Sequence, residues 1–171
     1  ETAAGRPASG WSLLVEGSDG GAQTRVTTVP AEALRGRVRV TATDYLVQEG
    51  GRRFTISDGD ASVQLRNFEA LDLDRETNGD IKLLFTMKVW DAPDAARIAM
   101  GSDAARASTG FAMAATGDWT RYGIPLKCLR SQGADMTALT LPFIIETQGS
   151  ADYAIGEVRL GTDAEVDLPC S

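Results

Sequence analysis

The segment with the clearest chemical potential is acidic, because Asp72, Asp74 and Glu76 follow one another at alternate positions. Alternate side chains share one face of a β-strand. Two carboxylates on one face could act as the nucleophile and the acid/base of a glycosidase. However, Arg75 interrupts the pattern and residues 77–80 (Thr-Asn-Gly-Asp) predict a turn. We therefore favour a solvated acidic loop over a catalytic strand.

The same segment invites a calcium hypothesis, since Asp74, Glu76 and Asn78 alternate before Gly79. The bidentate Glu that closes an EF-hand loop is missing, and Phe85 stands in its place. The chain contains no histidine, so the commonest general base and metal ligand is absent. We expect no cofactor, and a structural calcium ion in another loop is the one metal that stays open.

The strongest candidate for ligand contact is Trp90, which falls on the face of its predicted strand that also carries Lys88. Sugars stack their C–H faces on flat aromatic rings, while polar neighbours bond the hydroxyl groups. Tyr45, in a loop at a strand end, is a weaker candidate of the same kind. The alternative for Trp90 is a rim tryptophan packed under the loop at residues 91–94. Trp11 and Trp119 each open a predicted strand that has apolar residues further along it, so both are predicted to lie in the core.

The composition narrows the classes of partner. The net charge is −7, from 17 basic and 24 acidic residues, which argues against a phosphate backbone or an anionic membrane as partner. No apolar run is long enough to cross a bilayer. We therefore expect no nucleic acid and no membrane insertion, whereas neutral glycans remain compatible.

Most of the chain alternates between apolar and polar residues with a period of two, which is typical of half-buried strands. In residues 37–42, for example, Val38, Val40 and Ala42 share one face. Short helical turns are expected at residues 31–35 and 128–132. The pattern predicts an all-β fold, an antiparallel jelly-roll β-sandwich. Its strands are expected near residues 11–16, 24–29, 37–42, 53–57, 62–66, 81–90, 97–100, 120–124, 137–147 and 153–160.

The chain length suits a single domain. We place the sandwich at residues 11–161, between a linker at 1–10 and a tail at 162–171, both small and polar. We expect the chain to be part of a larger protein or a processed form. Cys128 and Cys170 leave two alternatives open, a bridge that ties the tail to the sandwich or two unpaired thiols.

An ordered set of short motifs carries a family resemblance. It comprises Gln48-Glu49 before a strand, residues 74–79 (Asp-Arg-Glu-Thr-Asn-Gly) before the long strand, Ala99-Met100-Gly101, Asp118-Trp119 through Ile124-Pro125-Leu126-Lys127-Cys128, residues 133–136, Pro142-Phe143 and residues 156–160. From residue 47 onward the chain resembles the C-terminal galactose-binding-like domain (ExoP type) of bacterial exo-β-glucan glucohydrolases and β-glucosidases of glycoside hydrolase family 3.

The resemblance implies a jelly roll appended to a catalytic (β/α)₈ barrel and its companion domain. Those upstream domains hold the family's catalytic residues, so no catalytic role passes to this chain. It also implies a secreted or periplasmic bacterial protein whose partners are its own catalytic domains and β-glucan oligosaccharides. Family members often carry a cysteine where this chain has Ser102, so their disulfides do not transfer.

Three functions follow from these observations. The leading hypothesis is a non-catalytic accessory module that binds carbohydrate weakly, braces the catalytic domains, or does both. The second is a self-sufficient jelly-roll glycanase that uses Asp72, Asp74 or Glu76. The third is a purely structural brace between domains.

Overall fold

A computed structural model describes residues 2–3, 6–7, 11–17, 23–27, 29–34, 36–46, 49–57 and 59–170. The predicted linker at residues 1–10 lies largely outside the described residues. The two described pieces within it are the short strands β1 (Thr2–Ala3) and β2 (Arg6–Pro7), which pair with each other.

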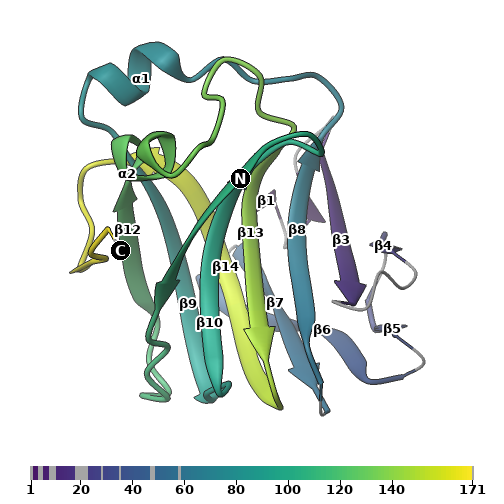
Figure 1. The fold of residues 1–171 in the computed structure, drawn as a ribbon. Coiled ribbons are helices and arrows are strands. Elements are labelled where there is room, and N and C mark those ends of the chain that lie inside the picture. The colour runs from purple at the N-terminus through teal and green to yellow at the C-terminus, as the bar shows by residue number, and fades with distance from the viewer. Residues whose placement is uncertain are drawn as a thin grey trace.

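The rest of the described chain forms two sheets packed face to face (Figure 1). The six-stranded sheet has the order β11-β10-β13-β8-β3-β4, and the seven-stranded sheet has the order β15-β12-β9-β14-β7-β6-β5. Every pair in them is antiparallel except β12 with β15. This arrangement confirms the predicted β-sandwich.

The strands of the six-stranded sheet are β3 (Trp11–Gly17), β4 (Thr24–Val26), β8 (Ala61–Asn67), β10 (Ala95–Gly101), β11 (Arg106–Phe111) and β13 (Leu141–Gln148). Those of the seven-stranded sheet are β5 (Ala31–Ala33), β6 (Val38–Leu46), β7 (Glu49–Ile56), β9 (Lys82–Asp91), β12 (Thr120–Pro125), β14 (Ala151–Gly161) and β15 (Val166–Asp167).

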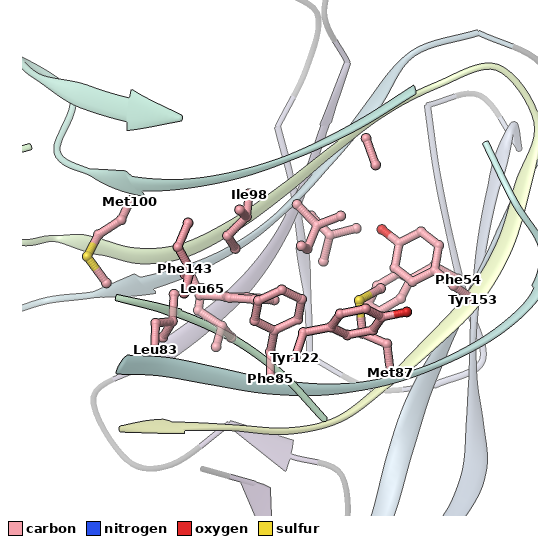
Figure 2. Packing of buried hydrophobic residues seen from close by; sticks show 14 of the residues in the cluster. Phe54, Leu65, Leu83, Phe85, Met87, Ile98, Met100, Tyr122, Phe143 and Tyr153 are labelled. Atoms are coloured by element: carbon pink, nitrogen blue, oxygen red, sulfur yellow. The ribbon is translucent and has the colours of Figure 1, made fainter. Parts of the chain in front are cut away.

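The core lies between the two sheets and is rich in aromatic contacts (Figure 2). The Phe85 ring centroid lies 5.5 Å from that of Tyr122 and 5.4 Å from that of Phe143. The predicted alternation holds along most strands, and Val38 and Val40 are fully buried. Ala42 differs, since it is exposed although it was predicted on the buried face with them. Strand β6 therefore continues beyond the region in which the core covers its inner face.

Two short helices lie at one end of the sandwich, α1 (Asp74–Asn78) and α2 (Leu126–Ser131) (Figure 1). The second confirms the turn expected near residues 128–132. The turn expected at residues 31–35 is wrong, because strand β5 begins there and pairs with β6.

The catalytic hypothesis for the acidic segment is also wrong in its premise. Asp74 and Glu76 lie on helix α1, and the Asp72 carboxylate accepts a hydrogen bond from the Asp74 backbone N–H at 3.1 Å. Asp72 thus forms a local turn that leads into the helix, whose N-cap residue is Leu73. The carboxylates do not share one strand face, so the geometry assumed for a glycanase is absent.

The residues expected to form a tail after position 161 pack on the sandwich. Strand β15 pairs with β12, Leu168 is buried in the core, and Cys128 forms a disulfide with Cys170. The structure therefore selects the bridged alternative. The bridge joins helix α2 to the last described residue, so the C-terminal segment belongs to the folded unit.

We predict that replacing Cys170 with Ser lowers the free energy of unfolding by about 4 kcal/mol, because the bridge closes a loop with a sequence separation of 42 residues. Urea denaturation of both proteins measures the difference. A reductant should destabilise the wild-type chain to the level of the variant and leave the variant unchanged. Equal stability of both proteins without reductant would contradict the prediction.

Candidate functional site

The predicted ligand residues Trp90 and Lys88 lie on the outer face of the seven-stranded sheet. Arg53 of β7 reaches over the small Ala154 of β14, and its guanidinium lies 4.0 Å from the Trp90 ring centroid. Lys88 Nζ lies 5.3 Å from the same ring. Arg53 also donates to Asp152 from Nε at 2.8 Å, and this bond raises its pKa. One face of the indole is therefore covered by a cation that is itself fixed.

Tyr45 lies on the same outer face and is fixed on two sides. Its hydroxyl donates to Glu157 Oε2 at 3.0 Å, and its ring meets Trp119 edge-to-face with centroids 4.8 Å apart. Burial raises the pKa of the Tyr45 hydroxyl, and the nearby Glu157 raises it further. Gly156 makes room for this ring, since a Cβ atom there would lie 2.5 Å from Tyr45.

The placement of Trp119 corrects a prediction. It was expected in the core, but it is half-buried on this outer face, where its ring passes over Gly51. The side chain of Trp11 lies outside the described side chains, so its predicted core position stays a prediction. The structure thus gathers Trp90, Trp119 and Tyr45 on one sheet face.

The charged side chains next to Tyr45 are paired with one another. Arg159 bonds both Glu157 and Asp163, and Arg121 also bonds Asp163. The pKa of the Asp163 carboxyl is lowered, mainly by the hydrogen bond from Arg159. These groups are already engaged within the domain, so a ligand would have to displace existing contacts to use them.

The opposite face, on the six-stranded sheet, is hollowed into a groove of about 700 Å³. One row of residues crosses five strands along it, because Glu16 pairs with Ser62, Ser62 with Glu146, Glu146 with Arg97, and Arg97 with Gly110. All five residues line the groove. We call this set the groove row.

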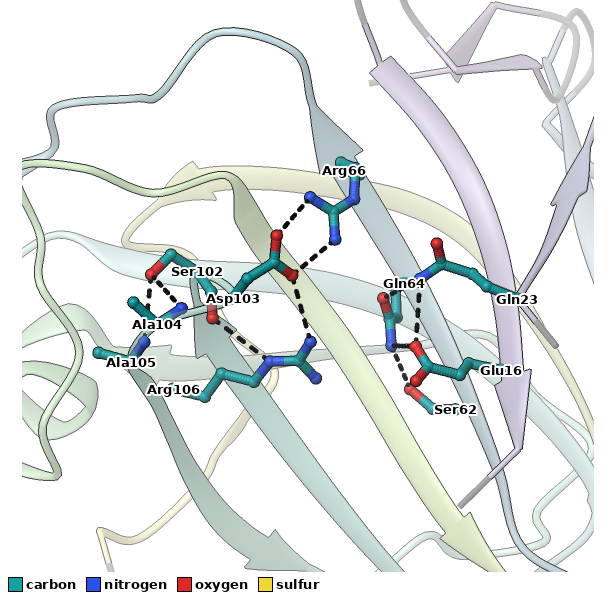
Figure 3. Close-up of polar contacts among 10 residues, drawn as sticks. All are labelled: Glu16, Gln23, Ser62, Gln64, Arg66, Ser102, Asp103, Ala104, Ala105 and Arg106. Carbon is teal, nitrogen blue, oxygen red and sulfur yellow. Dashed lines mark hydrogen bonds and ion pairs between the residues drawn. The ribbon is translucent and has the colours of Figure 1, made fainter. Parts of the chain in front are cut away.

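The next outward-facing row is buried and forms a firm base beside the groove. Leu14, Gln64, Ile144 and Ala99 pair across β3, β8, β13 and β10, and each is at most 6% exposed. Gln64 is the polar member. Its amide nitrogen donates to Glu16 Oε2 at 3.0 Å and to Ser62 Oγ at 3.1 Å (Figure 3). The buried amide therefore orients two members of the groove row.

An ion-pair belt crosses the same face on the other side of the buried row (Figure 3). Asp103, in the β10–β11 hairpin, bonds Arg66 of β8 at 2.8 and 3.1 Å, so the pair spans β13. Arg106 lies 3.8 Å from the same carboxylate and lines the groove. The hydrogen bond from Arg66 holds the pKa of Asp103 below its usual value. The belt bounds the groove toward one end of the strands.

The groove row offers polar groups that face outward. The side chain of Glu146 is exposed, and its carboxylate makes no hydrogen bond or ion pair with any described residue. Its neighbour Arg97 donates from Nε to Ser108 Oγ at 3.0 Å and from Nη2 to the Ser108 carbonyl oxygen at 3.2 Å. Sugar hydroxyls both donate and accept hydrogen bonds, so a row that combines carboxylate, guanidinium and hydroxyl groups suits them.

Sequence reasoning missed the groove row because its members come from five separate strands. Each residue reads as an ordinary outward-facing position in its own strand. Only the register between strands brings them together. The one available signal was a polar residue at a period-two position in each of four strand segments that lie far apart in the sequence, and such residues are too common to single out a site.

Among the described residues, no group of three or more His, Cys, Asp or Glu side chains is placed to hold a metal ion. No helix among the described residues is both long enough and apolar enough to span a bilayer.

Comparison with known proteins places the chain in a family. A family model described as galactose-binding domain-like, of the ExoP C-terminal type, matches residues 9–160. The chain belongs to this family. This result confirms the resemblance that the sequence motifs indicated. No match to a curated protein was found.

Solved structures share the fold of this ExoP-type domain. The extra C-terminal domain (X) of exo-1,3/1,4-β-glucanase ExoP from a Pseudoalteromonas species matches with a TM-score of 0.78 and 20% identity, over 97% of this chain and 95% of that one. In the structure of ExoP itself, the match has a TM-score of 0.77 and 20% identity, and covers all of this chain but only 22% of that one. The family 30 carbohydrate-binding module of a Clostridium thermocellum cellulosomal cellulase matches with a TM-score of 0.62 and 12% identity, over 78% of this chain and 90% of that one.

We predict that Gln64→Glu destabilises the domain by about 1–3 kcal/mol at neutral pH, because two carboxylates would then meet at Glu16 in a buried setting. Repulsion raises the pKa of the introduced carboxyl in the folded state. Below the ordinary glutamate pKa of about 4.3, the introduced side chain is protonated in both states and is tolerated. As the pH rises above this value toward the raised pKa of the folded state, the variant loses stability. Urea denaturation at pH 4 and pH 7 measures the change.

Gln64→Leu is the matched control, since it removes the same amide without adding a charge. Its loss of stability should be similar at both pH values. A Gln64→Glu variant that is equally destabilised at pH 4 and pH 7 would show that this side chain does not face Glu16 in solution.

Proposed function

We propose that this chain is a non-catalytic accessory module of a family 3 β-glucan-degrading glycoside hydrolase, and that its groove row binds neutral β-glucan. The observation that carries the proposal is the groove itself, a hollow of about 700 Å³ crossed by Glu16, Ser62, Glu146, Arg97 and Gly110. This volume lies in the range of small-molecule sites. The carboxylate of Glu146, which is exposed and has no partner among the described residues, lies at its centre.

The relation to other modules supports this assignment by analogy of fold. Two of the similar structures are named as a glucanase's extra C-terminal domain and as a carbohydrate-binding module. The chain corresponds to 22% of ExoP, so the catalytic part of a parent enzyme would lie outside this chain. Its own catalytic domains would then be its first partner, which it would brace.

The absence of histidine and the helical placement of Asp74 and Glu76 support a non-catalytic role for the chain alone. The disulfide between Cys128 and Cys170 supports a secreted or periplasmic location, because such bonds persist in oxidising compartments. The parent protein would accordingly act on β-glucan outside the cytoplasm.

The aromatic face of the seven-stranded sheet is the second candidate for glycan contact, through Trp90, Tyr45 and Lys88. The observation in its favour is that the fold gathers Trp119 with them on one face. We rank it below the groove for two reasons. The cation of Arg53 already stacks on Trp90, and the charges around the rings bond one another.

We predict that Glu146→Ala weakens binding of cellohexaose or mixed-linkage β-glucan hexasaccharides about tenfold, the effect of losing roughly 1.4 kcal/mol of interaction. Isothermal titration calorimetry on the isolated chain measures it. Glu69→Ala, which removes an exposed carboxylate that does not line the groove, is the matched control and should bind normally.

Trp90→Ala decides between the two faces in the same assay. Loss of affinity in Trp90→Ala together with full affinity in Glu146→Ala would move the site to the seven-stranded sheet. An absence of glycan binding by the unchanged chain would leave the purely structural brace. Release of reducing sugar from laminarin by the isolated chain would refute the non-catalytic assignment.

A further inference from the structure

The groove row ends at the edge of the sheet on a residue that has no side chain. Strand β11 is the last strand of the six-stranded sheet on that side, and Gly110 is its member of the groove row. The following residue, Phe111, sends its ring toward the core, where its centroid lies 5.8 Å from those of Phe85 and Tyr122. At Gly110, therefore, no side chain rises above the edge of the groove.

The backbone does not require glycine at this position. Gly110 is not among the glycines with positive φ. A Cβ atom built on it would lie 3.7 Å from Arg97 Nη1 and 3.9 Å from the Ala96 carbonyl oxygen, which are ordinary van der Waals distances. A larger side chain would fit the fold and would stand above the strand edge. What glycine contributes here is open space rather than a special conformation.

The shape of the groove sets the direction of an elongated ligand. The groove row crosses five strands, and four interstrand spacings of about 4.8 Å give a length of roughly 19 Å. Toward one end of the strands the way is limited by the belt of Arg66, Asp103 and Arg106. A linear chain that follows the groove row lies across the strands, and on the β11 side its path to solvent passes over Gly110.

We propose that a glycan bound in the groove row continues out of the groove over Gly110, so that the module accepts chains longer than the groove itself. This inference rests on the proposed function. It adds a ligand class, extended linear β-glucan polymers as well as short oligosaccharides. It also adds a determinant of chain-length specificity, the missing side chain at Gly110.

The test compares the binding of a polymer and of a short ligand by a variant in which a leucine side chain stands at the edge of the groove. In Gly110→Leu, affinity for soluble mixed-linkage β-glucan should fall about tenfold, while affinity for cellotriose should change less than about twofold. Affinity electrophoresis measures the polymer, and an NMR titration measures the trisaccharide. Gly79→Leu, at the end of α1 and outside the groove, is the matched control, and its affinities should match those of the wild-type chain.

The outcomes separate this inference from the function on which it rests. If the unchanged chain binds neither ligand, the proposed function fails and the inference fails with it. If the unchanged chain binds both and Gly110→Leu binds the polymer equally well, the exit over β11 is refuted alone. An equal loss for polymer and trisaccharide in a folded variant would likewise refute it, because Gly110 would then contact the bound sugar rather than the continuing chain.

Discussion

The register of β13 between β8 and β10 is the constraint on which both the core and the groove depend. Ile145 lies between Val63 and Ile98 on the inner face, and all three are at most 1% exposed. Because successive side chains of a strand point to opposite faces, this packing forces the next residue, Glu146, outward between Ser62 and Arg97. A slip of one residue would bury the carboxylate and expose the isoleucine, and both changes raise the free energy of the folded state. The groove row is therefore held by the hydrophobic core behind it.

The two outer faces differ in how their polar groups are used. On the seven-stranded sheet, Arg159, Asp163 and Glu157 bond one another, and Arg53 is held between Asp152 and Trp90. A ligand there would compete with bonds that already exist. On the six-stranded sheet the ion pairs gather in the belt, and Glu146 in the neighbouring hollow stays free of described partners. This contrast, more than the number of aromatic rings, is what favours the groove as a recognition surface.

The sequence predicts well the features that depend on neighbouring residues in the chain. It predicts poorly the features that depend on which strands pair side by side. The alternation in residues 37–42 and 53–57 identifies strands, and the motifs identify the family, because both are written along the chain. The acidic segment at residues 72–76 misleads, since three alternating carboxylates fit a strand face as well as the helix that forms. Trp119 misleads for a related reason. An aromatic residue that opens a strand can lie on either sheet face, and here the glycines at positions 51 and 156 make room for Trp119 and Tyr45 outside the core. The groove row is invisible without the pairing of five strands.

The buried row beside the groove explains how a shallow site could still select a ligand. Leu14, Ile144 and Ala99 face outward by register but are screened from solvent by their neighbours, so water is excluded from this part of the face. Gln64 is fixed within that packing and in turn holds Glu16 and Ser62. Side chains that are already held lose less conformational entropy when they bind, so more of each hydrogen bond to a sugar hydroxyl remains as affinity. Glu146 and the free side of Arg97 lack this support, and they supply the adjustable contacts beside a rigid base. The adjustable groups at the centre of such a face would tolerate different β-glucan linkages. The fixed groups and the belt would still keep the glycan chain in one direction.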